Sequence, residues 1–129
     1  MTVEGLRLGG KIYFSRKFKM SSSFKQGPFF HVVYFWLKNS KSQDDTIKLH
    51  NELNKFLAEN KQVLTSHVGS PVESERDVVD SSYDLSLIVT FKSKEDQDIY
   101  QDDPTHLKFI EKASYLWDKV KVYDSMEFS

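Results

Sequence analysis

The chain contains no cysteine and only three prolines and five glycines among its 129 residues. Without cysteine it can form no disulfide, no thiolate metal site and no cysteine nucleophile. This composition fits a reducing compartment, so we expect a cytoplasmic protein. The sequence also lacks any apolar run near the roughly 20 residues that cross a bilayer, and it has no apolar secretory signal at its amino terminus. We therefore expect a soluble protein with no membrane partner.

Positive charge is scarce outside the first 28 residues. Those residues carry six lysines and arginines and one acidic residue, Glu4, whereas the remainder carries twelve basic and eighteen acidic residues. Neutralisation of phosphates supplies most of the non-specific affinity of proteins for nucleic acids. Because the main part of the chain is acidic, we do not expect it to bind nucleic acid.

The length and the apolar share of 39% indicate one globular domain. Composition changes sharply at the turn-forming pair Gly27-Pro28. We therefore divide the chain into an amino-terminal extension, residues 1–28, and a domain, residues 29–129.

Three interpretations of the extension stay open. Met20 followed by three serines looks like an ordinary chain start, so residues 1–19 are most simply an addition from an upstream start codon. Apolar alternation on both sides of Gly9-Gly10 also permits a β-hairpin arm. The basic composition permits an organellar transit peptide, although arginine is scarce and the glycine pair interrupts the helical period.

Hydrophobic periodicity predicts a defined order of elements from residue 29 onward. The expected strands are residues 29–37, 63–69, 84–91 and 121–128. The expected helices run from a cap at Ser42 or Asp44 to about residue 60, from Ser93 to residue 101, and from a cap at Asp103 to about residue 119. This is the split β-α-β plan of a ferredoxin-like α+β fold, βαββαβ, with a four-stranded antiparallel sheet and helices on one face.

The apolar positions of these elements predict the core and the assembly. The first helix is expected to bury Ile47, Leu49, Leu53, Phe56 and Leu57, and the last helix Leu107, Ile110, Ala113, Leu116, Trp117 and Val120. The first strand, FFHVVYFWL, is apolar throughout, which predicts burial on both faces. An apolar sheet face of that size is seldom left bare, so we expect a homodimer whose sheets pack face to face.

Five short motifs occur along this domain, each of them once. They are Phe30-His31-Val32-Val33, Val68-Gly69, Tyr83-Asp84-Leu85, Val89-Thr90-Phe91 and Tyr100-x-x-x-Pro104-x-His106. With these motifs, residues 29–128 resemble the stress-responsive A/B barrel (Dabb) family, whose members are dimeric ferredoxin-like α/β barrels. The sequence departs from the family pattern at Asp103, where many relatives carry another histidine before the proline.

The resemblance also implies candidate site residues. The family includes a plant polyketide cyclase that closes a ring by cofactor-free aldol chemistry with a tyrosine and a histidine. Those positions look like Tyr100 and His106, and the cyclase's early-strand histidine looks like His31. The resemblance thus implies catalytic candidates His106, Tyr100 and His31, a small apolar or carbonyl-containing ligand near His106, and no cofactor. The cyclase's pocket-lining positions are not motif positions, so its substrate does not carry over.

Elementary chemistry supports the same pair. His106 lies in the expected first turn of a helix, where the positive end of the dipole favours neutral imidazole. Such an imidazole can accept a proton from a carbon acid, and a phenol can donate a hydrogen bond to the developing oxyanion. The pair therefore suits a cofactor-free cyclase, isomerase or lyase. The alternative is a non-catalytic stress-responsive or structural homodimer, in which His106 bonds the Asp103 cap region and Tyr100 packs on the sheet.

The remaining polar residues carry weaker signals. His50 and His67 are expected on solvated surfaces, and the acidic residues of 70–82 in a solvated connection. No histidine pair has metal-site spacing, and a spatial site of His31, His106 and Asp102 is the one arrangement left open. We expect no metal. The third strand lacks the glycine–aromatic pattern of ferredoxin-like RNA binders.

Overall fold

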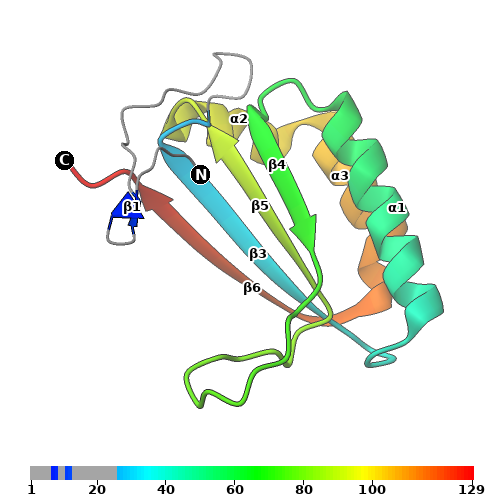
Figure 1. Ribbon diagram of the computed structural model, residues 1–129. Coiled ribbons are helices and arrows are strands. Elements are labelled where there is room, and N and C mark those ends of the chain that lie inside the picture. Colours follow the sequence, from blue (N-terminus) through cyan, green and yellow to red (C-terminus); the bar gives the residue numbers. More distant parts are fainter. Residues whose placement is uncertain (1–6, 9–10, 13–25) are drawn as a thin grey trace.

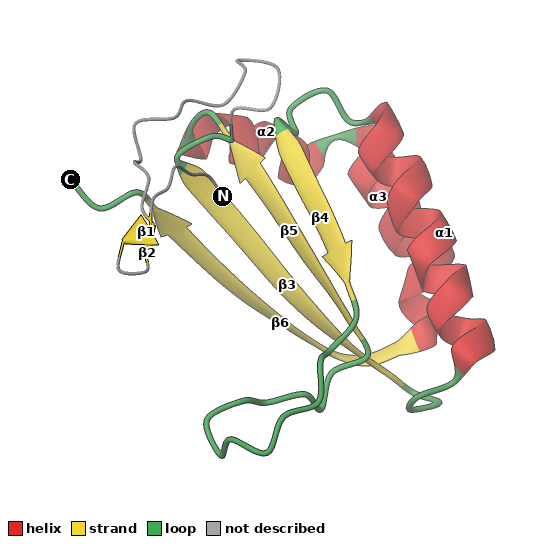
Figure 2. Cartoon of the chain, in the orientation of Figure 1, coloured by secondary structure: helices red, strands yellow, loops and turns green. Residues whose placement is uncertain are grey.

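The computed structural model describes residues 7–8, 11–12 and 26–129. The domain is an antiparallel sheet of four strands in the order β4-β5-β3-β6, with three helices on one face (Figure 1). Its elements are β3 (Phe29–Leu37), α1 (Gln43–Glu59), β4 (Thr65–Gly69), β5 (Leu85–Phe91), α2 (Lys94–Asp102), α3 (Pro104–Ala113), the 3₁₀ turn η2 (Ser114–Leu116) and β6 (Trp117–Met126). The predicted ferredoxin-like order, with its broken second helix, is confirmed, and β4 is an edge strand as expected (Figure 2).

Two short strands are described in the amino-terminal segment. These strands, β1 (Arg7–Leu8) and β2 (Lys11–Ile12), pair antiparallel on the two sides of Gly9-Gly10. The glycine pair and residues 1–6 and 13–25 lie outside the described residues. The division of the chain at residue 28 and the origin of the extension stay predictions.

Each helix begins at a polar cap. The side-chain oxygens of Ser42, Ser93 and Asp103 each accept a hydrogen bond from a backbone N–H two or three residues later. The predicted caps at Ser93 and Asp103 are therefore confirmed, and Ser42 rather than Asp44 caps the first helix. Pro104 occupies the first turn of α3, where its missing N–H costs nothing. The cap and the proline together break the second helix into α2 and α3.

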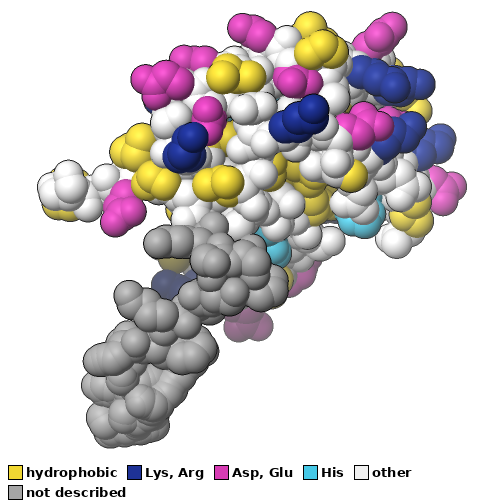
Figure 3. All heavy atoms as spheres, turned by 90° about the horizontal axis from the view of Figure 1, so that it is seen from above, with side chains coloured by type: hydrophobic (Ala, Val, Ile, Leu, Met, Phe, Trp, Pro, Cys, Tyr) yellow, Lys and Arg dark blue, Asp and Glu magenta, His cyan; other side chains and the backbone are white. Residues whose placement is uncertain are grey.

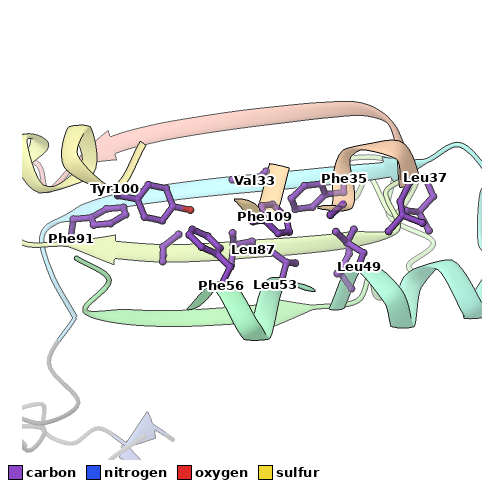
Figure 4. Close-up of a cluster of buried hydrophobic side chains, with 14 of the residues drawn as sticks. Val33, Phe35, Leu37, Leu49, Leu53, Phe56, Leu87, Phe91, Tyr100 and Phe109 are labelled. Carbon is purple, nitrogen blue, oxygen red and sulfur yellow. The ribbon is translucent and has the colours of Figure 1, made fainter. Parts of the chain in front are cut away.

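The core lies between the sheet and the helices (Figure 4). Alternate residues of β3 face the core, and α1 contributes three buried side chains. All but one of the residues of β5 are buried as well. The most deeply buried apolar side chains are Leu49, Leu53, Val89, Phe91, Tyr100 and Ala113. Burial of one such large side chain stabilises the fold by about 1.5–3 kcal/mol.

The last helix is shorter than predicted. We expected it to reach about residue 119, but α3 ends at Ala113 and β6 already begins at Trp117. Trp117 pairs with Leu37 across the sheet, and its ring lies 5.0 Å from that of Phe35. The alternating Val120 and Val122 fit a strand equally well, so packing on β3 overrides the helical period.

Some predicted core positions were wrong. Four predicted core residues are exposed, Ile47 (47%), Leu107 (57%), Ile110 (36%) and Val120 (37%), whereas Phe109, which we did not predict, is buried. Because α3 ends early, only Phe109 and Ala113, four residues apart, are buried on the side of the helix that faces the core. Leu107 and Ile110 lie at the edge of that side and are more exposed.

The outer face of β3 has no cover within the single chain. Its side chains Phe30, Val32, Tyr34 and Trp36 are only partly buried, so burial of both faces, as predicted, would need a second copy of the chain. The helices cover one side of the sheet and leave this face open (Figure 1). It is a surface of large apolar and aromatic side chains with no second layer of its own chain among the described residues.

A buried carboxylate organises the turn that leaves β3. Asp84 accepts hydrogen bonds from the backbone N–H of Leu37 (2.9 Å) and of Lys41 (2.8 Å). Lys41 has a φ of 64°, in the left-handed region that non-glycine residues seldom adopt. The ammonium group of Lys41 donates to the backbone carbonyl of Tyr83 at 2.9 Å. Hydrogen bonds therefore fix both the backbone and the side chain of Lys41.

The surface is mixed in charge. On the face seen from above, acidic and basic side chains lie interspersed (Figure 3). The connection over residues 70–82 projects beyond the end of the sheet and is largely exposed, as expected. In the described part of the chain, no helix is both long enough and apolar enough to cross a membrane.

Candidate active site

The three predicted site residues come from three separate elements and meet. His31 lies on the helix-facing side of β3, Tyr100 near the end of α2, and His106 in the first turn of α3. The ring centroids of His31 and Tyr100 are 5.5 Å apart, and those of Tyr100 and His106 are 5.1 Å apart. The helix break at Asp103 makes this possible, because α3 starts in a new direction and carries His106 back beside α2.

These side chains border one small cavity between the helices and the sheet, about 170 Å³ in volume. His31, Tyr100, Gln101 and His106 provide its polar groups. The rest of its lining is apolar: Val33, Phe35, Leu87, Phe109, Ile110, Trp117, Val120 and Val122. We call it the helix-side cavity. It combines an apolar chamber with a few convergent polar groups, the usual composition of a small-molecule site.

Tyr100 is the most deeply buried member of the site, with 1% of its surface exposed. Its ring lies 4.8 Å from that of Phe91 and 5.3 Å from that of Phe56, and its hydroxyl points along the core (Figure 4). Burial raises the pKa of this phenol well above its ordinary value, and the negative charge of Asp124 raises it further. Tyr100 therefore stays protonated and can act as a hydrogen-bond donor.

His106 is held in its neutral form. Burial is the main reason that its pKa lies below the ordinary value, and the nearby His31 lowers this pKa further. A backbone hydrogen bond with Gln101 and the charges of Asp103 and Asp102 act in the opposite direction without reversing the shift. The sequence indicated the helix dipole as a cause of the neutral form, and burial is a further cause that the structure adds.

The backbone N–H of His106 donates to the carbonyl oxygen of Asp103 at 2.9 Å, as the non-catalytic alternative requires, but the His106 side chain makes no such bond. Its Nδ1 atom is buried and has no hydrogen-bond partner in the described part of the chain. The Asp103 carboxylate instead accepts from the backbone N–H and the hydroxyl of Thr105. The other half of that alternative holds, since Tyr100 does pack in the core. A buried polar atom without a partner requires an explanation, and a bound ligand is one.

Asp124 is a member of the site that the sequence did not reveal. Its Oδ1 lies 2.6 Å from Nδ1 of His31, and the two residues are direct partners across β3 and β6. A carboxylate on Nδ1 holds the imidazole in one orientation and favours a proton on that nitrogen. Only the register between the strands, which sequence alone does not provide, would have paired these two residues.

The other histidines lie elsewhere. His50 contacts Asn54 on the exposed side of α1, and His67 is exposed on β4, as expected. Among the described residues no group of three or more histidine, aspartate or glutamate side chains is arranged to hold a metal ion. The combination of His31, His106 and Asp102 that the sequence left open does not form such a group.

Comparisons with known proteins agree with this fold. The model of the stress responsive A/B barrel domain, Dabb, matches residues 29–127. The comparison with curated proteins gave no match.

Solved structures with the same fold come from plants and bacteria. The Arabidopsis thaliana protein At3g17210 is 25% identical, with a TM-score of 0.67 over 79% of this chain and 97% of that one. A hydroxynitrile lyase from Passiflora edulis is 15% identical, with a TM-score of 0.65 over 79% and 94% of the two chains. A dimeric ferredoxin-like protein of unknown function from Thermobifida fusca is 14% identical, with a TM-score of 0.61 over 76% and 89%.

Proposed function

The chain belongs to the stress responsive A/B barrel (Dabb) family, and we propose that it binds a small, neutral carbonyl compound in the helix-side cavity. The observation that carries this proposal is the meeting of His31, Tyr100 and His106 at one apolar chamber. Tyr100 supplies a protonated phenol that can donate to a carbonyl oxygen. The apolar walls supply contact area for the rest of the ligand.

The size and charge of the cavity narrow the ligand class. An apolar cavity of roughly 150 Å³ holds a benzene ring, and the helix-side cavity measures about 170 Å³. None of its described lining residues is a lysine or an arginine, and the Asp124 carboxylate lies behind His31. A carboxylate or phosphate ligand would find no cation here, so the ligand is a neutral molecule of about one ring.

Cofactor-free catalysis is the second candidate function, favoured by the neutral His106 beside a protonated Tyr100. In the first step, the imidazole removes a proton from the carbon next to the ligand carbonyl. The electron pair of the broken C–H bond moves onto the carbonyl oxygen, where the Tyr100 hydroxyl stabilises the developing charge. Return of the proton to another atom of the ligand would complete an isomerisation. Attack of the enolate carbon on a second carbonyl of the ligand, followed by transfer of the imidazolium proton to the new alkoxide oxygen, would complete a cyclisation.

A lyase would need the same two groups, a neutral imidazole and a protonated phenol. One structural neighbour is named as a hydroxynitrile lyase. At 15% identity that neighbour supports the fold, and its reaction enters only as an example of chemistry that such a fold accommodates. The non-catalytic alternative calls for a filled interior. The presence of the helix-side cavity favours ligand binding over that alternative.

The test uses acetophenone, a one-ring ketone with exchangeable α-protons. The chain has two tryptophans, and Trp117 lines the helix-side cavity. Binding should therefore shift the indole N–H resonance of Trp117 in ¹⁵N-correlated NMR spectra. If acetophenone and similar ketones leave this resonance unchanged at millimolar concentration, the binding proposal fails.

Catalysis is tested separately by deuterium incorporation into acetophenone in D₂O. The wild-type protein should accelerate the exchange, and His106→Ala should slow it by about a hundredfold or more. Tyr100→Phe should also slow it, whereas His50→Ala, on the exposed side of α1, is the matched control and should leave it unchanged. Binding without accelerated exchange would leave the binding function standing and would rule out the catalytic one.

We further propose that the chain is a homodimer whose outer sheet faces pack together. The partly buried Phe30, Val32, Tyr34 and Trp36 on the uncovered face support this, as does the dimeric state of neighbours such as the Thermobifida fusca protein. Light scattering after size-exclusion chromatography should give twice the chain mass at micromolar concentration, and Val32→Lys should give the single mass. A wild-type monomer would contradict the proposal. The cytoplasmic location inferred from the lack of cysteine also stays a prediction.

A further inference from the structure

The hydrogen-bonding groups of the helix-side cavity limit its ligand more closely than its volume does. The raised pKa of Tyr100 keeps its phenol protonated, so this residue supplies a donor that a ligand carbonyl oxygen can satisfy. His31 and His106 line the same cavity. A ligand that displaces water from a buried ring nitrogen without replacing its hydrogen bond binds less tightly. The nitrogens of these two histidines therefore also select the ligand.

Asp124 assigns the roles of the two ring nitrogens of His31. Its Oδ1 lies 2.6 Å from Nδ1 of His31, which favours a proton on Nδ1 that is donated to the carboxylate. In a neutral imidazole with a proton on Nδ1, the Nε2 atom has a lone pair and accepts a hydrogen bond. His31 lines the cavity, whereas Asp124 is not one of its described lining residues. The ring edge that carries Nδ1 therefore turns away from the cavity, and the edge that carries Nε2 turns towards it.

The Nε2 atom of His31 is fixed in place and open to a ligand. The His31 side chain is buried, and its ring packs against those of Tyr100 at 5.5 Å and Phe91 at 6.3 Å. Among the described residues, Nε2 has no hydrogen-bond partner, yet it is not sealed, since Nδ1 of His106 is the single side-chain atom there that is both sealed and unpaired. A molecule in the cavity can therefore reach this acceptor.

We propose that the ligand is a hydroxy ketone, whose carbonyl oxygen accepts from Tyr100 and whose hydroxyl donates to Nε2 of His31. This inference rests on the proposed binding function and narrows its ligand class. The ring centroids of His31 and Tyr100 are 5.5 Å apart, so the ligand hydroxyl lies close to its carbonyl. Asp124 is a positioning residue, because it acts on the ligand only through His31. His106 stays free to take a proton from carbon.

Three one-ring ketones test the hydroxyl: phenacyl alcohol, propiophenone and acetophenone. Propiophenone has the shape of phenacyl alcohol with a methyl group in place of the hydroxyl, so the two differ in the proton that can be donated. The indole N–H resonance of Trp117, a lining residue of the cavity, reports the binding of each probe to the full-length protein. Phenacyl alcohol should bind about three- to tenfold more tightly than propiophenone, as expected for one hydrogen bond.

Asp124→Asn tests the positioning role. The asparagine amide can donate to Nδ1 of His31, which moves the ring proton to Nε2 and removes the acceptor. The preference for phenacyl alcohol over propiophenone should then fall to about twofold or less. Asp118→Asn, at an exposed position of the same strand, is the matched control and should keep the preference. Long-range ¹H–¹⁵N spectra of the imidazole rings show which nitrogen of His31 carries the proton in each protein.

Three results would overturn the proposal. One is a proton on Nε2 of His31 in the ligand-free wild-type protein at the pH of the binding assay, because that atom could then accept nothing. Another is binding of propiophenone at least as tight as that of phenacyl alcohol. The third is an unchanged preference in Asp124→Asn. If acetophenone binds and the hydroxyl adds nothing, the carbonyl-binding function stands and the hydroxy ketone is ruled out, whereas binding of none of the three ketones would remove both.

Discussion

Replacement of Tyr100 by phenylalanine separates the catalytic interpretation of the site from the structural one. The Tyr100 ring is 1% exposed, so the substitution keeps the buried area and removes only the hydroxyl oxygen. In the described part of the chain, the only side-chain polar atom that is both fully buried and without a hydrogen-bond partner is Nδ1 of His106, so the Tyr100 hydroxyl is not a fully sealed unpaired group. A fully buried hydroxyl without a partner costs about 1–3 kcal/mol relative to one in water, and this value is an upper limit for Tyr100.

The size of the expected effect follows from the position of this oxygen. Because the hydroxyl borders the helix-side cavity, water in the cavity can offset part of that cost. We therefore expect Tyr100→Phe to raise the free energy of unfolding by about 0.5–1 kcal/mol. For a domain near 100 residues this corresponds to a rise in Tm of about 2–8 °C. The same variant should lose the accelerated exchange of ketone α-protons.

The assay is urea unfolding followed by circular dichroism, with the Tm from a thermal scan as a second measurement. Tyr115→Phe is the matched control, because it removes the same group from a side chain that is 59% exposed to solvent. We expect its unfolding free energy to stay within about 0.5 kcal/mol of the wild-type value. A loss of more than about 1 kcal/mol in Tyr100→Phe would refute the reasoning, since the hydroxyl would then be a structural hydrogen-bonding group.

Three further predictions concern pH and the backbone. The folded-state pKa of His106 lies below its unfolded value, so its stabilising effect is complete above about pH 6.5 and is lost as the pH falls towards the folded pKa. His106→Asn should therefore flatten the rise of unfolding free energy with pH below about pH 6.5, measured by urea titration; because the imidazole is only partly buried, the change should stay below the limit of about 1.4 kcal/mol per pH unit for one proton, and an unchanged slope would contradict the buried neutral form. Asp84→Ala should cost about 2–4 kcal/mol, because two backbone N–H groups lose a buried carboxylate, and a cost under 1 kcal/mol would show that water replaces it. Gly27→Ala would place a Cβ 2.1 Å from the carbonyl oxygen of Phe91, so a fall of about 1–3 kcal/mol is expected in thermal unfolding, and a wild-type Tm would show that this junction yields freely.

The fold was predictable because its signals are local. Strand and helix periods, the caps at Ser93 and Asp103 and the proline that follows require only neighbouring residues to be recognised. The end of α3 was not predictable in this way. Residues 114–120 fit a helix as well as a strand, and the contacts of Trp117 with β3, distant in sequence, decide between them.

The site was predictable in part. The family resemblance named His31, Tyr100 and His106, and the structure brings them together. Asp124 was missed because its partnership with His31 depends on the register of two strands that are 93 residues apart. The cavity itself was unpredictable, since its volume depends on how Phe109 and Trp117 pack rather than on any motif.

The alternation of β6 makes the two faces of the sheet depend on a single alignment. Val120 and Val122 face the helix-side cavity, and Lys119 and Lys121 lie on the opposite face of the sheet beside Trp36 and Tyr34. Deletion of one residue upstream in this strand would exchange the two sets, placing ammonium groups in the apolar cavity and isopropyl groups on the outer face. Single substitutions can thus change either face alone, whereas a one-residue length change disrupts both. Over evolutionary time this strand should therefore accept replacements readily and reject insertions and deletions.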